Sequence, residues 1–365
     1  MKKLITVTKE TNNFDFLRLL AAFFVFIGHA ILINRGAGII NWNSGLLISA
    51  LGVNIFFFIS GFLITKSWID SNNTIFFIIK RFLRIYPALI FSGIITIFII
   101  GPITTFFTVN HYLSDPQTYK YFTNITLLNL ANIKTAVLPG VFVTNKIPSI
   151  VNASLWTIPI EIGCYLSIIL MGLGKFFHKK SIFLYISFFF LLYAVISHTG
   201  SRPYLFFQDT DNFPYSDIVR LSTYFILGIT AYLYRSAISI SNIQFFTLLI
   251  TSLYFINTSY FTLTSYLILP LLVLYIATIK SNILKKITGY GDFSYGFYLF
   301  AFPIQQTVSF FLNNKINIIL QIIFSFLITT ILAIISWYII EKRFIDLKYY
   351  FFKYYSKKIS CKKTG

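Results

Sequence analysis

Two ionisable residues, Arg18 and His29, lie within the first long apolar segment of the chain, FDFLRLLAAFFVFIGHA. Their spacing of eleven residues corresponds to about 1100° of α-helix, so both side chains fall on one face, about 16 Å apart along the axis. Ionisable groups inside a membrane segment are costly and usually functional. Taken singly, Arg18 could pair with Asp15 or reach the lipid headgroups, and His29 could be a structural core histidine. Together they suggest a site for the two ends of one elongated ligand.

A second basic pair, Arg81 and Arg84, opens the third apolar segment in the sequence KRFLRIYPAL. Residues three apart share a helical face. Guanidinium groups bind phosphate oxygens in bidentate geometry, so the pair predicts a phosphate-binding site. The alternative is a basic anchor at the membrane interface.

Glu161 lies inside the fourth apolar segment, NASLWTIPIEIGCYL, where a carboxylate needs a partner. Pro159 removes a backbone donor, so the sequence predicts a kinked helix with a polar pocket beside Glu161. Measured along their helices, Glu161 and His29 reach similar depth, and we expect them to meet. A structural glutamate bonded to a neighbouring helix is the alternative.

The amino-acid composition indicates that these residues are positioned by transmembrane helices. Hydrophobic residues make up 56% of the 365 residues and charged residues only 11%, against roughly 25% charged in a soluble domain. Segments long enough to cross a bilayer core of about 30 Å predict an all-α, polytopic membrane bundle of about ten transmembrane helices. They lie near 14–34, 44–67, 85–107, 152–174, 181–198, 217–235, 243–257, 261–279, 293–312 and 317–340.

The charge of +19 is interpreted as membrane orientation rather than nucleic-acid binding. Most of the 30 lysines and arginines fall in alternate loops, which predicts that both termini are cytoplasmic. We expect no cleaved signal peptide, one membrane domain over 1–345, and a basic cytoplasmic tail over 346–365 that binds anionic headgroups or, alternatively, a partner. The 2 cysteines predict neither a disulfide framework nor a metal site.

Six features in chain order together resemble a known family. They are the Arg18 to His29 spacing, GVNIFFFISGFLI (52–64), the Arg81 and Arg84 pair, SLWTIPIE (154–161), SYGFYL (294–299) and SWYIIEKRF (336–344). Their order and spacing are similar to those of the membrane acyltransferase-3 family of O-antigen and exopolysaccharide O-acetylases. The chain departs from many members at Ala301, where they have histidine, with Tyr298, Gln305 and Gln306 nearby as polar candidates. It is expected to be a stand-alone form without the SGNH esterase-like domain of fused members.

The resemblance implies a multi-pass O-acyltransferase of the bacterial inner membrane. It would transfer an acyl group, expected to be acetyl, from cytoplasmic acyl-CoA to a hydroxyl of an extracytoplasmic or lipid-linked glycan. Acetyl-CoA is then a substrate, and we expect no permanently bound cofactor or metal. A transporter or flippase with an intramembrane polar pathway is the alternative.

The resemblance also assigns roles to the candidate residues. Arg18, Arg81 and Arg84 would hold the phosphates of acyl-CoA. His29 would act as a general base towards the sugar hydroxyl, helped by Glu161, or as a nucleophile that forms an acyl-histidine. Further candidates for the acceptor or the pocket are Trp156, Tyr298, Asn54 and Ser60. Helix packing is the alternative for the Asn54 and Ser60 segment, and an interfacial aromatic belt is the alternative for Trp156.

Overall fold

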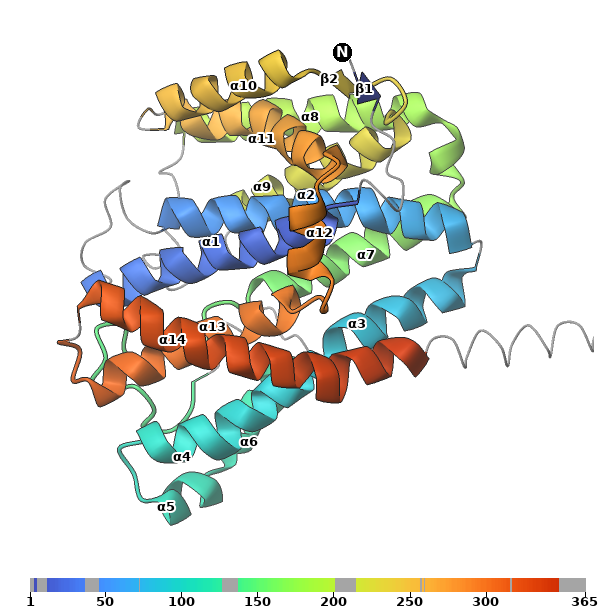
Figure 1. The fold of residues 1–365 in the computed structure, drawn as a ribbon. Helices are drawn as coiled ribbons and strands as arrows, with labels where there is room; N and C mark the ends of the chain where they lie inside the picture. Colours follow the sequence, from blue (N-terminus) through green and yellow to red (C-terminus); the bar gives the residue numbers. More distant parts are fainter. Residues whose placement is uncertain are drawn as a thin grey trace, which may run out of the picture. The chain divides into compact units, whose positions relative to one another are not determined.

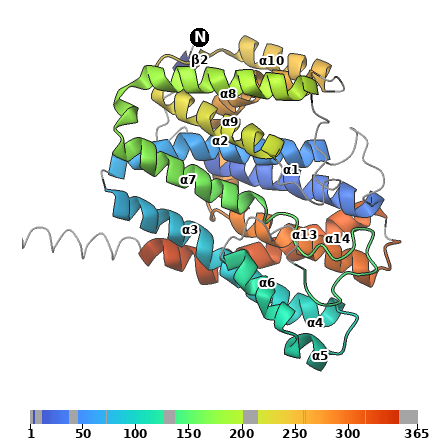
Figure 2. The ribbon, with the colours of Figure 1, turned by 180° about the vertical axis from the view of Figure 1, so that it is seen from behind.

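The computed structural model describes residues 3–4, 12–36, 46–71, 73–126, 137–200, 215–256, 258, 260–315 and 317–347. The described residues are mostly helical, which confirms the all-α class (Figures 1 and 2). The long helices are α1 (Phe14–Arg35), α2 (Leu46–Ser71), α3 (Thr74–Ile95), α7 (Thr157–Leu173), α8 (Lys180–Gly200), α9 (Tyr215–Leu233), α10 (Asn242–Phe255), α11 (Phe261–Thr278), α13 (Ser294–Phe311) and α14 (Ile318–Ile335). Each of them overlaps one of the apolar segments expected from the sequence.

Shorter elements join or extend the long helices. They are η1 (Thr96–Ile100), α4 (Gly101–Thr104), α5 (Val109–Ser114), α6 (Pro116–Thr126), η2 (Phe176–His178), α12 (Asn282–Thr288), η3 (Ser336–Glu341) and the strands β1 (Lys3–Leu4) and β2 (Ser239–Ile240). The two strands pair antiparallel. The elements η1 and η3 are turns of π-helix that continue α3 and α14.

Five helical stretches are long and apolar enough to cross a membrane: Phe14–Arg35, Leu47–Ser71, Thr74–Thr104, Phe261–Thr278 and Ile318–Leu347. Shorter apolar helices cover Thr157–Leu173, Lys180–Ala194 and Asn242–Phe255. The chain is therefore a multi-pass membrane protein, and ten crossings stay a prediction. The basic tail predicted over 346–365 lies outside the described residues from 348 onward.

Two of the expected helix starts are wrong. The third helix begins at Thr74 rather than near 85, because the apolar run TIFFII precedes the arginines and the Asn73 side chain accepts a hydrogen bond from Phe76 N at 3.1 Å. Arg81 and Arg84 therefore lie inside the helix. The fourth helix begins at Thr157, so Pro159 occupies its first turn, where no backbone donor is required. The Leu155 carbonyl, which the proline was expected to free, accepts a hydrogen bond from Ile158 N at 3.1 Å, so the reason for a kink beside Glu161 does not hold.

The chain divides into two compact units. The first contains Met1–Lys66 and Ile160–Ser294, and the second contains Ser67–Pro159 and Tyr295–Gly365. In the first unit α8 packs on α9, α10 on α11, and α1 on α11 and α12 (Figure 1). The ring of Phe62 in α2 lies 5.1 Å from Phe14 of α1 and 5.3 Å from Tyr232 of α9, so these three helices share an aromatic core.

Close helix packing by small residues is confirmed in the first unit. A Cβ on Gly52 would collide with the backbone carbonyl of Ala21, and a Cβ on Gly61 would collide with that of Phe225. Both glycines therefore let α2 approach its neighbours, α1 and α9, at backbone distance. This is the packing role that the sequence offered as one of two alternatives for the segment containing Asn54 and Ser60.

In the second unit α3 packs against α6 and η3. The ring of Phe300 in α13 lies 6.0 Å from Phe91 of α3, and Phe297 lies 5.7 Å from Phe326 of α14. These aromatic contacts place the first turns of α13 between α3 and α14. Arg84 of α3 and Glu341 of η3 lie on elements that pack together.

Candidate functional site

Helix α1 carries Arg18 and His29 on one uninterrupted stretch, so the spacing expected to place them on one face is preserved. His29 is 9% exposed. The start of α1 is fixed by Asn13, whose Nδ2 donates to the backbone oxygens of Ile276 at 2.9 Å and Ile279 at 2.7 Å. These carbonyls belong to the C-terminal end of α11, so the position of Arg18 is set by contacts outside its own helix.

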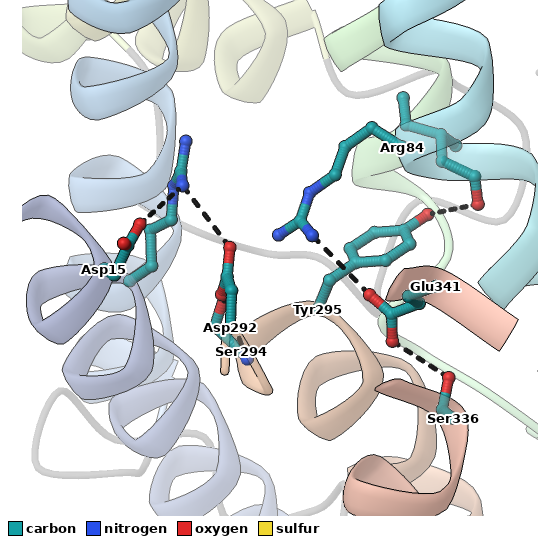
Figure 3. A network of polar contacts seen from close by, with 9 residues as sticks. Asp15, Arg84, Asp292, Ser294, Tyr295, Ser336 and Glu341 are labelled. Atoms are coloured by element: carbon teal, nitrogen blue, oxygen red, sulfur yellow. Dashed lines mark hydrogen bonds and ion pairs between the residues drawn. The ribbon is translucent and has the colours of Figure 1, made fainter. Parts of the chain in front are cut away.

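The guanidinium of Arg18 forms ion pairs with two carboxylates, those of Asp15 and Asp292, which are labelled in Figure 3. Its Nη1 is 3.1 Å from Asp15 Oδ1 and 3.4 Å from Asp292 Oδ2. Asp292 is itself oriented by Ser294, whose hydroxyl donates to Asp292 Oδ1 at 2.5 Å. The pairing with Asp15 is one of the alternatives that the sequence predicted. The Arg18 side chain remains 24% exposed, so part of it is open to another anion.

Glu161 is half-buried in the second turn of α7. Its Oε1 accepts a hydrogen bond from the hydroxyl of Tyr165, one turn further along the same helix. Glu161 and His29 both belong to the first unit. Their expected pairing stays a prediction.

Asn54 belongs to a buried polar group between α2 and α9. Its side-chain oxygen accepts a hydrogen bond from Arg220 Nη1. Arg220 also donates to Asp217 Oδ1, from Nε at 3.2 Å and from Nη2 at 2.8 Å, and the two side chains are 6% and 9% exposed. Asn54 thus accepts a hydrogen bond from the arginine of a buried ion pair, which offsets part of the cost of burying the charge. Ser60 is half-buried on the same helix.

Arg84 lies against a buried carboxylate in the second unit (Figure 3). Its Nη1 is 3.6 Å from Glu341 Oε2, and Glu341 Oε1 accepts from the Ser336 hydroxyl at 2.9 Å. The Arg84 side chain is 20% exposed, whereas that of Glu341 is 1% exposed. The guanidinium carbon also lies 5.7 Å from the centre of the Tyr295 ring, at cation–π distance.

Room for the Glu341 carboxylate comes from a glycine. A Cβ on Gly296 would lie 3.0 Å from Glu341 Oε1 and 3.3 Å from the Cβ of Ser336. The neighbouring Tyr295 donates its hydroxyl to the backbone oxygen of Ile85 at 3.3 Å. The SYGFYL and SWYIIEKRF sequences and the second arginine of the pair therefore meet in one cluster.

Arg81, the other arginine of the pair, has different neighbours from Arg84. Its Nη2 lies 3.5 Å from the Ser67 hydroxyl, and its guanidinium carbon lies 5.8 Å from the centre of the Phe77 ring. Arg81 and Arg84 belong to the second unit, and Arg18 belongs to the first. The phosphate site expected from all three stays a prediction.

Tyr298 fixes the chain on either side of Trp156. Its hydroxyl donates to the backbone oxygen of Ser154 at 2.8 Å and lies 2.7 Å from the hydroxyl of Thr157. Trp156 is half-buried between these two residues, just before α7. Tyr298 is thus a support for the start of α7, and Trp156 is the more exposed of the two.

The sequence interpretation missed Asp292, Asp217, Arg220 and Glu341 as parts of polar clusters. A signal for them existed, since only 11 residues of the chain are Asp or Glu and each carboxylate near an apolar segment needs a partner. Within the described part of the chain, no three His, Cys, Asp or Glu residues come together as metal ligands.

Residues 11–338 match a protein family described as an acyltransferase domain. An O-acetyl transferase of Shigella phage Sf6 is 28% identical over 344 residues, which cover 92% of this chain and 96% of the relative. Nodulation protein 10 of Rhizobium leguminosarum bv. viciae is 36% identical over 166 residues, which cover 43% of each protein. No solved structure matches the chain.

Proposed function

The chain belongs to the membrane acyltransferase-3 family, and from this premise we propose that it is an O-acyltransferase that uses cytoplasmic acyl-CoA as donor. The acyl group is acetyl, and the acceptor is a hydroxyl of an extracytoplasmic or lipid-linked glycan. The likeness of nearly the whole chain to a relative named O-acetyl transferase supports acetyl transfer. The observation that carries the proposal is the burial of His29 on the helix that also presents Arg18, whose side chain is 24% exposed.

His29 supplies the catalytic imidazole by one of two routes. As a general base it takes the proton of the sugar hydroxyl while the sugar oxygen attacks the thioester carbonyl. The new C–O bond forms, the C–S bond breaks, and CoA leaves as a thiol after taking up a proton. As a nucleophile His29 first forms a C–N bond to the acyl carbon while the C–S bond breaks, and CoA leaves as a thiol with the imidazole proton. The sugar oxygen then attacks the acyl carbon, the C–N bond breaks, and the imidazole takes up the hydroxyl proton.

Glu161 is the proposed partner of this imidazole. A carboxylate that accepts the imidazole N–H orients the ring and favours its charged form during proton transfer. The hydrogen bond from Tyr165 to Glu161 supports this role, because it fixes the direction of the carboxylate.

Arg18, Arg81 and Arg84 are the proposed ligands of the CoA phosphates. Phosphate oxygens accept charge-assisted hydrogen bonds from guanidinium groups, often two at a time. Arg18 and Arg84 support this role because each keeps a fifth or more of its side chain exposed beside a carboxylate, at 24% and 20%. Acyl-CoA enters as a substrate, and no other cofactor is part of the proposal.

For the acceptor, Trp156 is the proposed stacking surface and Tyr298 its support. Asn54 and Ser60 were candidates for the pocket as well. The hydrogen bond from Arg220 to Asn54 favours a packing role for that residue, and Ser60 remains a proposed pocket residue.

We place the protein in the bacterial inner membrane with both termini cytoplasmic and with the lipid bilayer as its surroundings. The excess of basic residues in alternate loops supports this orientation. It puts the loop between α3 and α7 on the outer side, where a glycan is available.

Replacing His29 by alanine tests the proposal. We expect His29→Ala to lose the O-acetyl signal in NMR spectra of the cell-surface polysaccharide, and the purified variant to transfer acetyl groups at least about a hundredfold more slowly. The matched control is His178→Ala, since His178 is exposed in η2. Equal membrane insertion of both variants is checked by detergent extraction and gel filtration. Unchanged acetylation in His29→Ala contradicts the proposal and favours the transporter or flippase alternative.

A further inference from the structure

An irregular segment of the second unit, residues 141–156, runs along α13. Three positions of α13 bind it, two through side chains and one through a backbone oxygen. Tyr298 donates to Ser154 O at 2.8 Å, the Leu299 backbone oxygen accepts from Asn152 Nδ2 at 2.9 Å, and Gln306 contacts the region around Asn145. The contacts extend over more than two turns of an apolar helix that the sequence predicts to span the membrane.

Gln306 makes the densest of these contacts, and its side chain is fully buried at 0% exposure. Its Oε1 accepts from Asn145 Nδ2 at 2.9 Å. Its Nε2 uses both hydrogens, donating to Ile147 O at 2.8 Å and to Ile150 O at 3.0 Å. Asn145 Nδ2 also donates to the backbone oxygen of Gln306 at 2.9 Å, so the Asn145 amide binds Gln306 at two points.

The turn that Gln306 holds contains a strained residue. Ser149 has a φ of 60°, a left-handed conformation that residues other than glycine rarely adopt. It stands between Ile147 and Ile150, whose carbonyls are the two acceptors of the Gln306 amide. Strained backbone persists only where its surroundings over-determine it, and it clusters at functional sites.

Backbone carbonyls that are enclosed by the protein need hydrogen-bond partners from it, because solvent does not reach them. Gln306 supplies these partners for the turn from Ile147 to Ile150. Asn152 and Tyr298 then fix the chain that continues through Ser154 to Trp156. Hydrogen bonds from α13 therefore hold the conformation of the chain from Ile147 to Trp156, the proposed stacking surface.

We propose that Gln306 is a positioning residue for the acceptor: it holds the Ile147–Ile150 turn in the conformation that lets the 141–156 segment receive a sugar hydroxyl. The inference rests on the proposed acyl transfer to a glycan. It assigns acceptor recognition to the 141–156 segment and leaves binding of the donor CoA to other residues.

Gln306→Leu tests this, since leucine has a similar volume and makes none of the three side-chain hydrogen bonds. The matched control is Thr307→Val, because the Thr307 hydroxyl donates to Pro303 O of its own helix at 2.7 Å. The purified proteins are given radiolabelled acetyl-CoA and polysaccharide isolated from a host that lacks the gene. We expect Gln306→Leu to raise the KM for polysaccharide about tenfold or more, with the KM for acetyl-CoA within about twofold of wild type. Thr307→Val should change neither value by more than about twofold.

Hydrogen exchange on the same proteins reports whether Gln306 holds the turn. Amides of residues 145–150 should exchange faster in Gln306→Leu and at the wild-type rate in Thr307→Val. If Gln306→Leu does not insert, Asn145→Leu breaks the same contact from the segment side and should give the same rise in the KM for polysaccharide.

The outcomes separate two kinds of failure. A wild-type protein that transfers no acetyl group to the polysaccharide overturns the proposed function, and the inference with it. An active wild type with an unchanged polysaccharide KM in Gln306→Leu overturns the inference alone. So does an equal rise of both KM values, because that pattern indicates a general loss of structure.

Discussion

Replacing Arg84 by methionine should destabilise the protein because it leaves the Glu341 carboxylate, which is 1% exposed, without its cation. Two unit charges 3.6 Å apart attract by about 4–5 kcal/mol at an effective dielectric constant of about 20. Removing one member of a buried pair typically costs about 3–5 kcal/mol, which agrees with that magnitude. We therefore expect Arg84→Met to lower the free energy of unfolding by about 3–5 kcal/mol.

Removing the carboxylate charge of Glu341 should lower the free energy of unfolding less than removing Arg84 does. Glu341→Gln keeps the volume and can still accept the hydrogen bond from Ser336, and it leaves a cation that is 20% exposed. A loss of about 1–2 kcal/mol is expected. The double variant contains neither charge and should return to within about 1 kcal/mol of wild type. Unfolding in detergent followed by circular dichroism measures all three, with Arg235→Met as the control because Arg235 is exposed.

Activity separates the structural role of Arg84 from its proposed role in donor binding. Loss of a charge-assisted hydrogen bond to phosphate should raise the KM for acetyl-CoA about tenfold to a hundredfold in Arg84→Met. The double variant regains stability and should keep the high KM, because methionine offers phosphate no donor. Recovery of the wild-type KM in the double variant refutes the phosphate role. Wild-type stability of Arg84→Met refutes the electrostatic reasoning.

Two further substitutions test the packing and the buried charges of the first unit. Gly61→Ala places a Cβ against the Phe225 carbonyl and should lower the free energy of unfolding by about 1–3 kcal/mol. The control is Gly163→Ala, whose Cβ meets no atom within 4 Å. It should leave the free energy of unfolding unchanged or raise it by up to about 1 kcal/mol. Equal effects of the two would contradict the backbone contact between α2 and α9. Arg220→Met leaves Asp217, 9% exposed, unpaired and should cost about 3–5 kcal/mol, with recovery on adding Asp217→Asn. An unrecovered double variant would show that shape rather than charge matters there.

The sequence was sufficient to predict where the long helices lie, because an apolar run of that length must satisfy its backbone groups internally. It failed at helix starts that depend on local caps. Asn73 starts α3 ahead of the arginines through its side-chain hydrogen bond to Phe76 N. Pro159 was expected to kink a helix that in fact begins only two residues before it. Cap positions decide such boundaries, and hydropathy alone does not contain them.

For the candidate site, the sequence predicted local partners and missed distant ones. Asp15 stands three residues from Arg18, so helical geometry alone makes the pair available. Asp292 is 274 positions from Arg18, and Glu341 is similarly far along the chain from Arg84. The first contact arises from the packing of α1 near the segment between α12 and α13, and the second from the packing of α3 on η3. No periodicity within one helix encodes them.

The arginines that pair with carboxylates differ in how much of the side chain stays exposed, and this separates arginines with a structural role from those that can also bind a ligand. Arg220 lies 2.8 Å from Asp217 with only 6% of its side chain exposed, so an incoming anion has no access to it. Arg84 lies 3.6 Å from its carboxylate and is 20% exposed, and Arg18 is 24% exposed between two carboxylates at 3.1 and 3.4 Å. An unpaired cation within the membrane is costly, so these carboxylates stabilise the fold whether or not donor is bound. A phosphate carries more charge and more acceptor oxygens than a carboxylate, and it can therefore bind the exposed side of either guanidinium while the carboxylate stays in place.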